Sequence, residues 1–271
     1  MKTFAIACLA LTLAACATSA PHAPEPAHDA GVRIERVDRE FDLGDGVMRV
    51  AIDNPFGEIN VRGRDEREVG IHAVVQRMAP GFYGAEIHGR REGDTLRIGV
   101  SLEGALVSSE TRPMRADLAV YLPGDLALEL STRDGRIDAK RRPGPIEATT
   151  DSGEIHAASL VRLSLKSTSG QIRAAAIGKR WPGTSEIVTD TGRIVLLVPT
   201  FGDVALEAKT GGKLSTGFGL SVHETPGGGH EAHAKYGAGT SILRARSASG
   251  EIVLDQLVLL GDDKSLPEDD D

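Results

Sequence analysis

A short phrase recurs through this chain: a Ser- or Thr-rich segment precedes a glycine, a polar residue follows it, and an aliphatic residue comes next. Four copies stand in a row between positions 130 and 196, with 18, 17 and 22 residues from one glycine to the next. An interval of about 20 residues is typical of a solenoid, in which each repeat buries its apolar face only by stacking on its neighbours. The glycine and aliphatic positions of the clearest copies are Gly57 and Ile59, Gly135 and Ile137, Gly153 and Ile155, Gly170 and Ile172, Gly192 and Ile194, and Gly250 and Ile252.

Within each copy polar and apolar side chains alternate, and a period of two indicates a half-buried strand. Stacked in register, the aliphatic residues would form a column, and burying each one contributes roughly 1.5 to 3 kcal/mol. The glycine fits a bend that needs either positive φ or a close approach of two backbones. A second alternating segment precedes several bends, as at residues 126–130, so two strands and two bends make one rung of a β-helix.

We therefore predict an all-β protein whose residues 32–260 form a parallel β-helix-like β-solenoid, about 20 residues per rung, with a less regular N-terminal β part. The expected order is the rung from Asn54 to Val61, then wider strands as far as Pro123, then regular rungs to Leu197. The copy around Gly212 lies between those of Gly192 and Gly250, and the step of 38 residues to Gly250 is about two periods. Residues 261–271 form an acidic tail that we expect to be disordered.

The N-terminus has the pattern of a secretion signal. In residues 1–15 a lysine precedes a short apolar run and two alanines. The next residue is Cys16, and Leu13 to Cys16 resembles the bacterial lipobox, which implies cleavage before Cys16 and attachment of lipid to it. Ala17, rather than Asp, implies routing to the outer membrane. Residues 16–31 read as the lipidated cysteine and a flexible linker rich in Pro and Ala. An ordinary signal peptide cut near Ala20 is the alternative.

Together these features resemble the bacterial envelope family labelled "putative adhesin", a β-solenoid domain carried here on a lipoprotein. The resemblance rests on VMRVAIDNPFGEINVRG from Val47, LPGDLALELSTRDGRIDA from Leu122, the tandem TDSGEIHA and STSGQIRA phrases, VPTFGDVAL, and the closing GAGTSILRARSASGEIVL. It covers about Val32 to Leu260. The family motifs are structural, so the resemblance implies the fold, a cell-envelope location and adhesin-like binding, and implies no catalytic residue.

Two alternative functions, metal binding and carbohydrate cleavage, are compatible with particular residues of the sequence. His223, His230 and His233 could supply three ligands to a zinc ion, which would make a metal-dependent binding module. The competing interpretation is a mobile Gly-rich loop with incidental histidines. The outward charges Glu58, Arg136, Glu154, Arg193 and Glu251 could instead line a carbohydrate-cleaving face, as on β-helical enzymes. The simpler interpretation is that these positive and negative side chains alternate along the stack and attract one another across neighbouring strands.

The charge of the chain bears on its partners. The formal net charge of −8 gives no support to nucleic-acid binding. No catalytic or cofactor motif appears, so we expect a non-enzymatic protein without a cofactor. The sequence favours a lipid-anchored envelope protein whose ladders of Ser, Thr and charged side chains serve as a binding or scaffolding surface for an envelope protein or a glycan.

Overall fold

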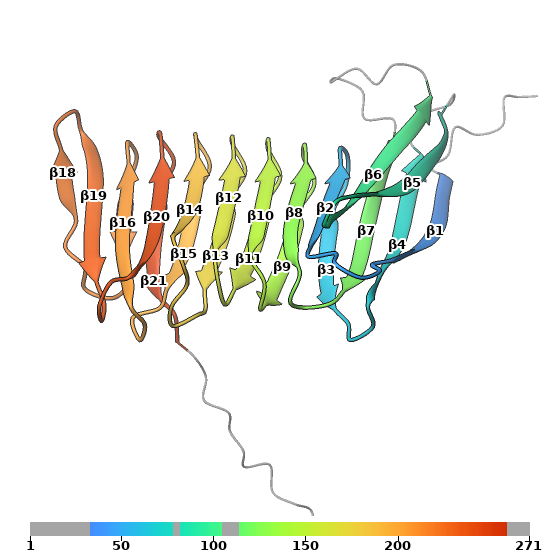
Figure 1. Cartoon of the computed structure of the whole chain (residues 1–271). Coiled ribbons are helices and arrows are strands. Elements are labelled where there is room, and N and C mark those ends of the chain that lie inside the picture. Colours follow the sequence, from blue (N-terminus) through green and yellow to red (C-terminus); the bar gives the residue numbers. More distant parts are fainter. Residues whose placement is uncertain (1–32, 78–81, 105–113, 259–271) are drawn as a thin grey trace, which may run out of the picture. The chain divides into compact units, whose positions relative to one another are not determined.

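The computed structural model describes residues 33–77, 82–104 and 114–258, and every regular element in these ranges is a β-strand (Figure 1). The strands form two mixed sheets that enclose one apolar core between them, which confirms the all-β prediction. Sheet A has ten strands and sheet B has eleven.

In spatial order, sheet A consists of β1 (Arg33–Asp42), β4 (Glu68–Arg77), β7 (Met114–Leu122), β3 (Ile59–Gly63), β9 (Ile137–Arg142), β11 (Ile155–Ser159), β13 (Ile172–Ala176), β15 (Ile194–Val198), β21 (Ile252–Gln256) and β17 (Leu214–Thr216). Sheet B consists of β18 (His223–Thr225), β19 (Gly229–Lys235), β16 (Val204–Thr210), β20 (Ser241–Ser247), β14 (Thr184–Thr189), β12 (Leu163–Ser167), β10 (Ile146–Thr150), β8 (Ala127–Thr132), β2 (Arg49–Asn54), β6 (Thr95–Gly104) and β5 (Phe82–Glu92).

In the middle of both sheets the strands are parallel, and the chain alternates between the sheets. A strand of sheet B is followed in the chain by a strand of sheet A, in most cases through the recurring glycine, and we call two such consecutive strands a strand pair. Successive pairs stack in register, so that Ile137, Ile155, Ile172 and Ile194 are Cα partners of one another along sheet A. All four side chains are fully buried. The phrase therefore places one aliphatic residue of each strand pair in a common internal column.

The glycines of the phrase are required by close approach of neighbouring turns. A Cβ added to Gly153 would lie 1.9 Å from the carbonyl oxygen of Gly135, and one added to Gly170 would lie 1.8 Å from that of Gly153. Positive φ is not the reason in these turns, because among the glycines of the phrase only Gly57, at 130°, has it. A side chain at these positions would force stacked backbones apart.

The Ser and Thr residues of the phrase hold the same turns together. The buried Ser167 hydroxyl accepts a hydrogen bond from the Gly170 N–H at 2.8 Å. Thr189 accepts one from the Gly192 N–H at 3.0 Å and donates to the Thr168 carbonyl of the preceding strand pair at 3.3 Å. Each hydroxyl thus satisfies a turn N–H that would otherwise be buried without a partner.

The stacking order departs from the chain order at both ends, so the order expected for the N-terminal half was wrong. The pair β2/β3 lies between β6/β7 and β8/β9, and the pair β20/β21 lies between β14/β15 and β16/β17 (Figure 1). The pattern of outward charges favours the second insertion. Glu251 contacts Arg193 at 3.1 Å on one side and Lys213 at 3.8 Å on the other, whereas stacking in chain order would place the two cations side by side.

Antiparallel strands complete both ends of the stack. β1 and β4 extend sheet A beyond β7, and β5 extends sheet B beyond β6. At the other end β19 pairs with β16 and β18 pairs with β19. The interpretation of the stretch from Val222 to Gly239 as a mobile loop was therefore wrong, because seven of its residues form β19 and three form β18.

Candidate functional site

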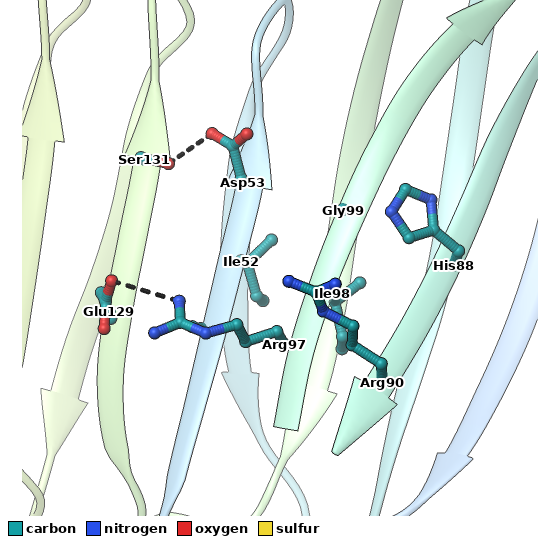
Figure 2. A pocket seen from close by; sticks show the side chains of 10 residues that line it. Ile52, Asp53, His88, Arg90, Arg97, Ile98, Gly99, Glu129 and Ser131 are labelled. Carbon is teal, nitrogen blue, oxygen red and sulfur yellow. Dashed lines mark hydrogen bonds and ion pairs between the residues drawn. The ribbon is translucent and has the colours of Figure 1, made fainter. Parts of the chain in front are cut away.

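A polar hollow of about 360 Å³ opens on the outer face of sheet B, where β5, β6, β2 and β8 lie side by side (Figure 2). Its charged and polar side chains come from all four strands. They are Asp53 on β2, His88 and Arg90 on β5, Arg97 on β6, and Glu129 and Ser131 on β8.

Two small residues in the middle of this face create the hollow. Ala51 is the Cα partner of Arg97 on one side and Glu129 on the other. Gly99 is the partner of Asp53 and His88. Because side chains that share a face of a sheet stand side by side, the missing bulk at these two positions leaves a depression among longer polar neighbours. The His88 ring leans over Gly99, where an added Cβ would lie 2.8 Å from its Nε2.

In the lower part of the hollow, arginines form ion pairs with glutamates on nearby strands. Arg97 contacts Glu129 at 3.6 Å and donates to Glu92 at 2.6 Å, and Arg49 contacts Glu129 at 3.5 Å. The hydrogen bond to Glu92 and the charge of Glu129 raise the pKa of Arg97 above its ordinary value. Arg97 is therefore a fixed cation held by carboxylates at both sides, which limits its range of rotamers.

The upper part of the hollow is less neutralised. Ser131 donates a hydrogen bond to the Asp53 carboxylate across the boundary of β2 and β8 (Figure 2). Among the described residues Asp53 has no cation within salt-bridge distance, and its side chain is exposed. Its carboxylate therefore has lone pairs free to accept hydrogen bonds from a ligand, beside a hydroxyl and an imidazole.

This arrangement suits hydrogen-bonded recognition of a polar ligand. Carboxylate, guanidinium, hydroxyl and imidazole groups lie within one depression of the sheet, and among the described residues no aromatic ring other than His88 lines it. The sequence interpretation missed all of these residues. The signal it could have used is the pair Ala51 and Gly99, two small residues at outward positions of strands that also carry Arg49, Asp53 and Arg97 outward.

The three candidate metal ligands are not brought together. His223 is the Cα partner of Glu231, and strand alternation puts His233 on that same face of the hairpin and His230 on the opposite one. His230 Nδ1 contacts the Gly212 carbonyl oxygen at 2.7 Å, and His233 Nε2 lies 3.9 Å from Glu231. Within residues 33–77, 82–104 and 114–258, no group of three His, Cys, Asp or Glu side chains has the geometry of a metal site.

The outward charges considered for carbohydrate cleavage form a ladder of ion pairs on sheet A. Arg136 contacts Glu154 at 3.6 Å, and Glu58 contacts Arg115 at 3.0 Å. With Glu251 between Arg193 and Lys213, each of the three carboxylates has a basic neighbour. The ladder therefore lacks the pair of unneutralised carboxylates that glycoside hydrolysis uses.

His156, beside this ladder, supplies a pH-dependent term. Burial, followed by the charge of Lys140, lowers its pKa, although Glu154 at 3.5 Å and Asp138 at 3.9 Å oppose the shift. The unfolded chain then binds a proton at a pH where the folded protein does not, so stability falls as pH drops below about 6.5 toward the lowered pKa. We expect His156→Gln to flatten the dependence of Tm on pH in that range. Equal slopes for wild type and His156→Gln would show that His156 contributes nothing.

Cys16 and the predicted signal sequence lie outside the described residues. In the part of the chain that the structure describes, no helix of the length and apolarity needed to cross a bilayer is found.

Comparison with known proteins supports the fold. A solved structure of a "putative cell adhesion protein" from Clostridium sporogenes aligns with 83% of this chain and 100% of its own length, at 13% identity and a TM-score of 0.51. Two solved structures of a "putative adhesin", from Bacteroides fragilis and Parabacteroides distasonis, align at 10% and 9% identity with TM-scores of 0.26 and 0.21, each over 82% of this chain and 97% of its own. No family model and no curated protein matches. The first of these alignments shows that this chain shares its fold with the Clostridium sporogenes protein.

Proposed function

We propose that this chain is a non-catalytic, adhesin-like protein of the cell envelope, anchored by lipid at Cys16, that binds a glycan in the hollow around Asp53. The observation that carries the proposal is the hollow itself, where an unneutralised carboxylate, a hydroxyl and an imidazole surround a gap left by Ala51 and Gly99. Sugar hydroxyls both donate and accept hydrogen bonds, and the strands that carry Asp53 and Ser131, β2 and β8, are each paired on both sides within sheet B.

The body that presents the hollow is, in this proposal, a β-solenoid of about 20 residues per rung with an inserted pair at each end. The in-register column of Ile137, Ile155 and Ile172 and the contacts between successive glycine turns support this description. Such a body keeps outward side chains in fixed rows, so a binding site can be built without loops.

Glycan binding is tested by an array of envelope oligosaccharides and by pull-down on purified peptidoglycan sacculi, followed by isothermal titration with the best oligosaccharide. We expect Asp53→Ala to weaken binding at least about tenfold, because it removes a charged acceptor. Glu186→Ala, a carboxylate on the same face of sheet B but on β14, is the matched control and should bind as wild type does. Absence of glycan binding, or equal losses in the two variants, would refute the proposal.

The same titration samples decide between binding and hydrolysis. A carbohydrate-active enzyme would release shorter products, visible by mass spectrometry, and would lose this activity in Asp53→Asn or Glu129→Gln. Recovery of the oligosaccharide intact after prolonged incubation is the result expected here.

Lipid anchoring is tested by expressing the full chain with radiolabelled palmitate in a bacterial host. Label in the wild type and none in Cys16→Ser is expected, with the wild type in the membrane fraction and the variant released. Cys8→Ser should retain the label, because that residue would leave with the signal. Unlabelled wild type would contradict the anchor.

A further inference from the structure

A second, more apolar hollow lies on the outer face of sheet A. It has a volume of about 870 Å³ and crosses β11, β13 and β15. Its floor includes the small residues Ala158 and Ala175, which are Cα partners, and its sides include Leu160, Leu197 and Val258. Leu160 and Val258 are 45% and 71% exposed. We call this hollow the groove.

A β-bulge places basic side chains along the groove. In β9, Lys140 and Arg141 together stand opposite the single residue Ala158 of β11. Arg141 has φ of 56° and is the one non-glycine residue with positive φ in the described ranges. A non-glycine residue in this conformation costs roughly 1 to 2 kcal/mol, and bulges commonly re-aim side chains at binding sites. This strained bulge places Lys140 and Arg141 in the lining of the groove.

The cations of the groove are only partly neutralised. Lys140 contacts Asp138 at 2.7 Å. Arg141 and Arg173 are exposed, and among the described residues neither has a carboxylate within salt-bridge distance. The groove therefore fits an occupant that combines apolar side chains with several negative charges.

We propose that the occupant is the chain's own C-terminal segment, residues 259–271, which lies outside the described residues. The described chain ends at the groove: Leu257 is fixed by a hydrogen bond from its N–H to the Val198 carbonyl at 2.9 Å, and Val258 lines the groove. The residues that follow are LLGDDKSLPEDDD, two leucines and then six carboxylates against one lysine. This order matches an apolar floor near β21 and basic side chains at its far side.

The reach of the segment agrees with this match. From β21 to β9 there are four strand spacings of about 4.8 Å, or about 19 Å. Five or six extended residues span that distance at about 3.4 Å each. Asp262 and Asp263 therefore come within reach of Arg173 and Arg141 when the two leucines cover the floor. Because the segment is attached to the body, docking is intramolecular and needs little intrinsic affinity.

Trypsin cleavage after Lys264 measures docking in the full chain carrying Cys16→Ser. Mass spectrometry monitors the loss of residues 265–271. We expect the rate of this cleavage to be at least about tenfold lower in the full chain than in the free peptide 259–271. In 1 M salt, where charges are screened within about 3 Å, this protection should shrink while the free peptide is unaffected. Arg141→Glu with Arg173→Glu should restore the rate of the free peptide, and Lys166→Glu on the outer face of sheet B should not.

Two controls keep the result interpretable. Asp262→Asn with Asp263→Asn leaves the folded body untouched and should also abolish protection, so the test survives if the arginine variants unfold. Equal cleavage of full chain and free peptide would overturn the proposal. Protection that grows with protein concentration would overturn it as well, since the groove would then hold the segment of a second copy.

Discussion

Replacing Gly170 by alanine is expected to lower the free energy of unfolding by at least about 4 kcal/mol, enough to prevent folding in a protein of ordinary stability. The added Cβ would lie 1.8 Å from the carbonyl oxygen and 2.7 Å from the carbonyl carbon of Gly153. Both atoms belong to backbone in the neighbouring turn, so no side chain can rotate away. The two strand pairs would have to separate and break their in-register hydrogen bonds. Thermal and urea unfolding followed by circular dichroism measures the loss.

Gly93→Ala is the matched control for this substitution. Gly93 has φ of 63° and open space around its Cα, so alanine there meets no atom and costs only the roughly 1 to 2 kcal/mol of a left-handed residue. If Gly170→Ala were no worse than Gly93→Ala, close approach of the turns would not be what selects glycine in the phrase.

Ile252→Asp is expected to cost on the order of 5 kcal/mol or more, although Ile252 lies in the last strand of the described chain. Its side chain is fully buried in the column, with Ile194 on one side and Leu214 on the other. A carboxylate there has no solvent and no cation. Val253→Asp, one residue along on the outward face, should change stability by less than about 1 kcal/mol.

The same substitution at Leu214 tests the stacking order. Leu214 lies on β17, the end strand of sheet A, and is 7% exposed. We expect Leu214→Asp to be less damaging than Ile252→Asp, because the end of a stack frays toward solvent. The reverse ranking would follow if the pairs stacked in chain order, with β21 at the end.

Local pattern was enough to predict the strands of the repeated phrase and the inward column of this protein. The alternation around each glycine is local, and burial of Ile137, Ile155, Ile172 and Ile194 follows from it. The segment of β5 was not singled out among the wider strands expected before Pro123, although Ala85 and Ile87 alternate with polar residues there. It is an edge strand whose apolar side is short, so its signal was weak.

The order of the pairs could not be predicted from the spacing of the glycines. Every strand pair presents the same aliphatic column, so hydrophobic burial is nearly indifferent to which pair is the neighbour. Outward charges distinguish the alternatives, and Glu251 between Arg193 and Lys213 was a readable signal. The hollow around Asp53 was missed for the same reason, because β6, β2 and β8 become neighbours only after β2 is inserted between strands that follow it in the chain.

Disulfide formation tests the stacking of the strand pairs most directly. In a chain carrying Cys16→Ser, Val195→Cys with Val253→Cys joins Cα partners of β15 and β21, and Val253→Cys with Ser215→Cys joins partners of β21 and β17. Adjacent strands lie about 4.8 Å apart, within the range that a disulfide bridges. Val195→Cys with Ser215→Cys is separated by β21, about 9.6 Å, beyond that range. We predict intramolecular disulfides in the first two chains under mild oxidation and none in the third. A disulfide in the third chain alone would contradict the inserted strand pair.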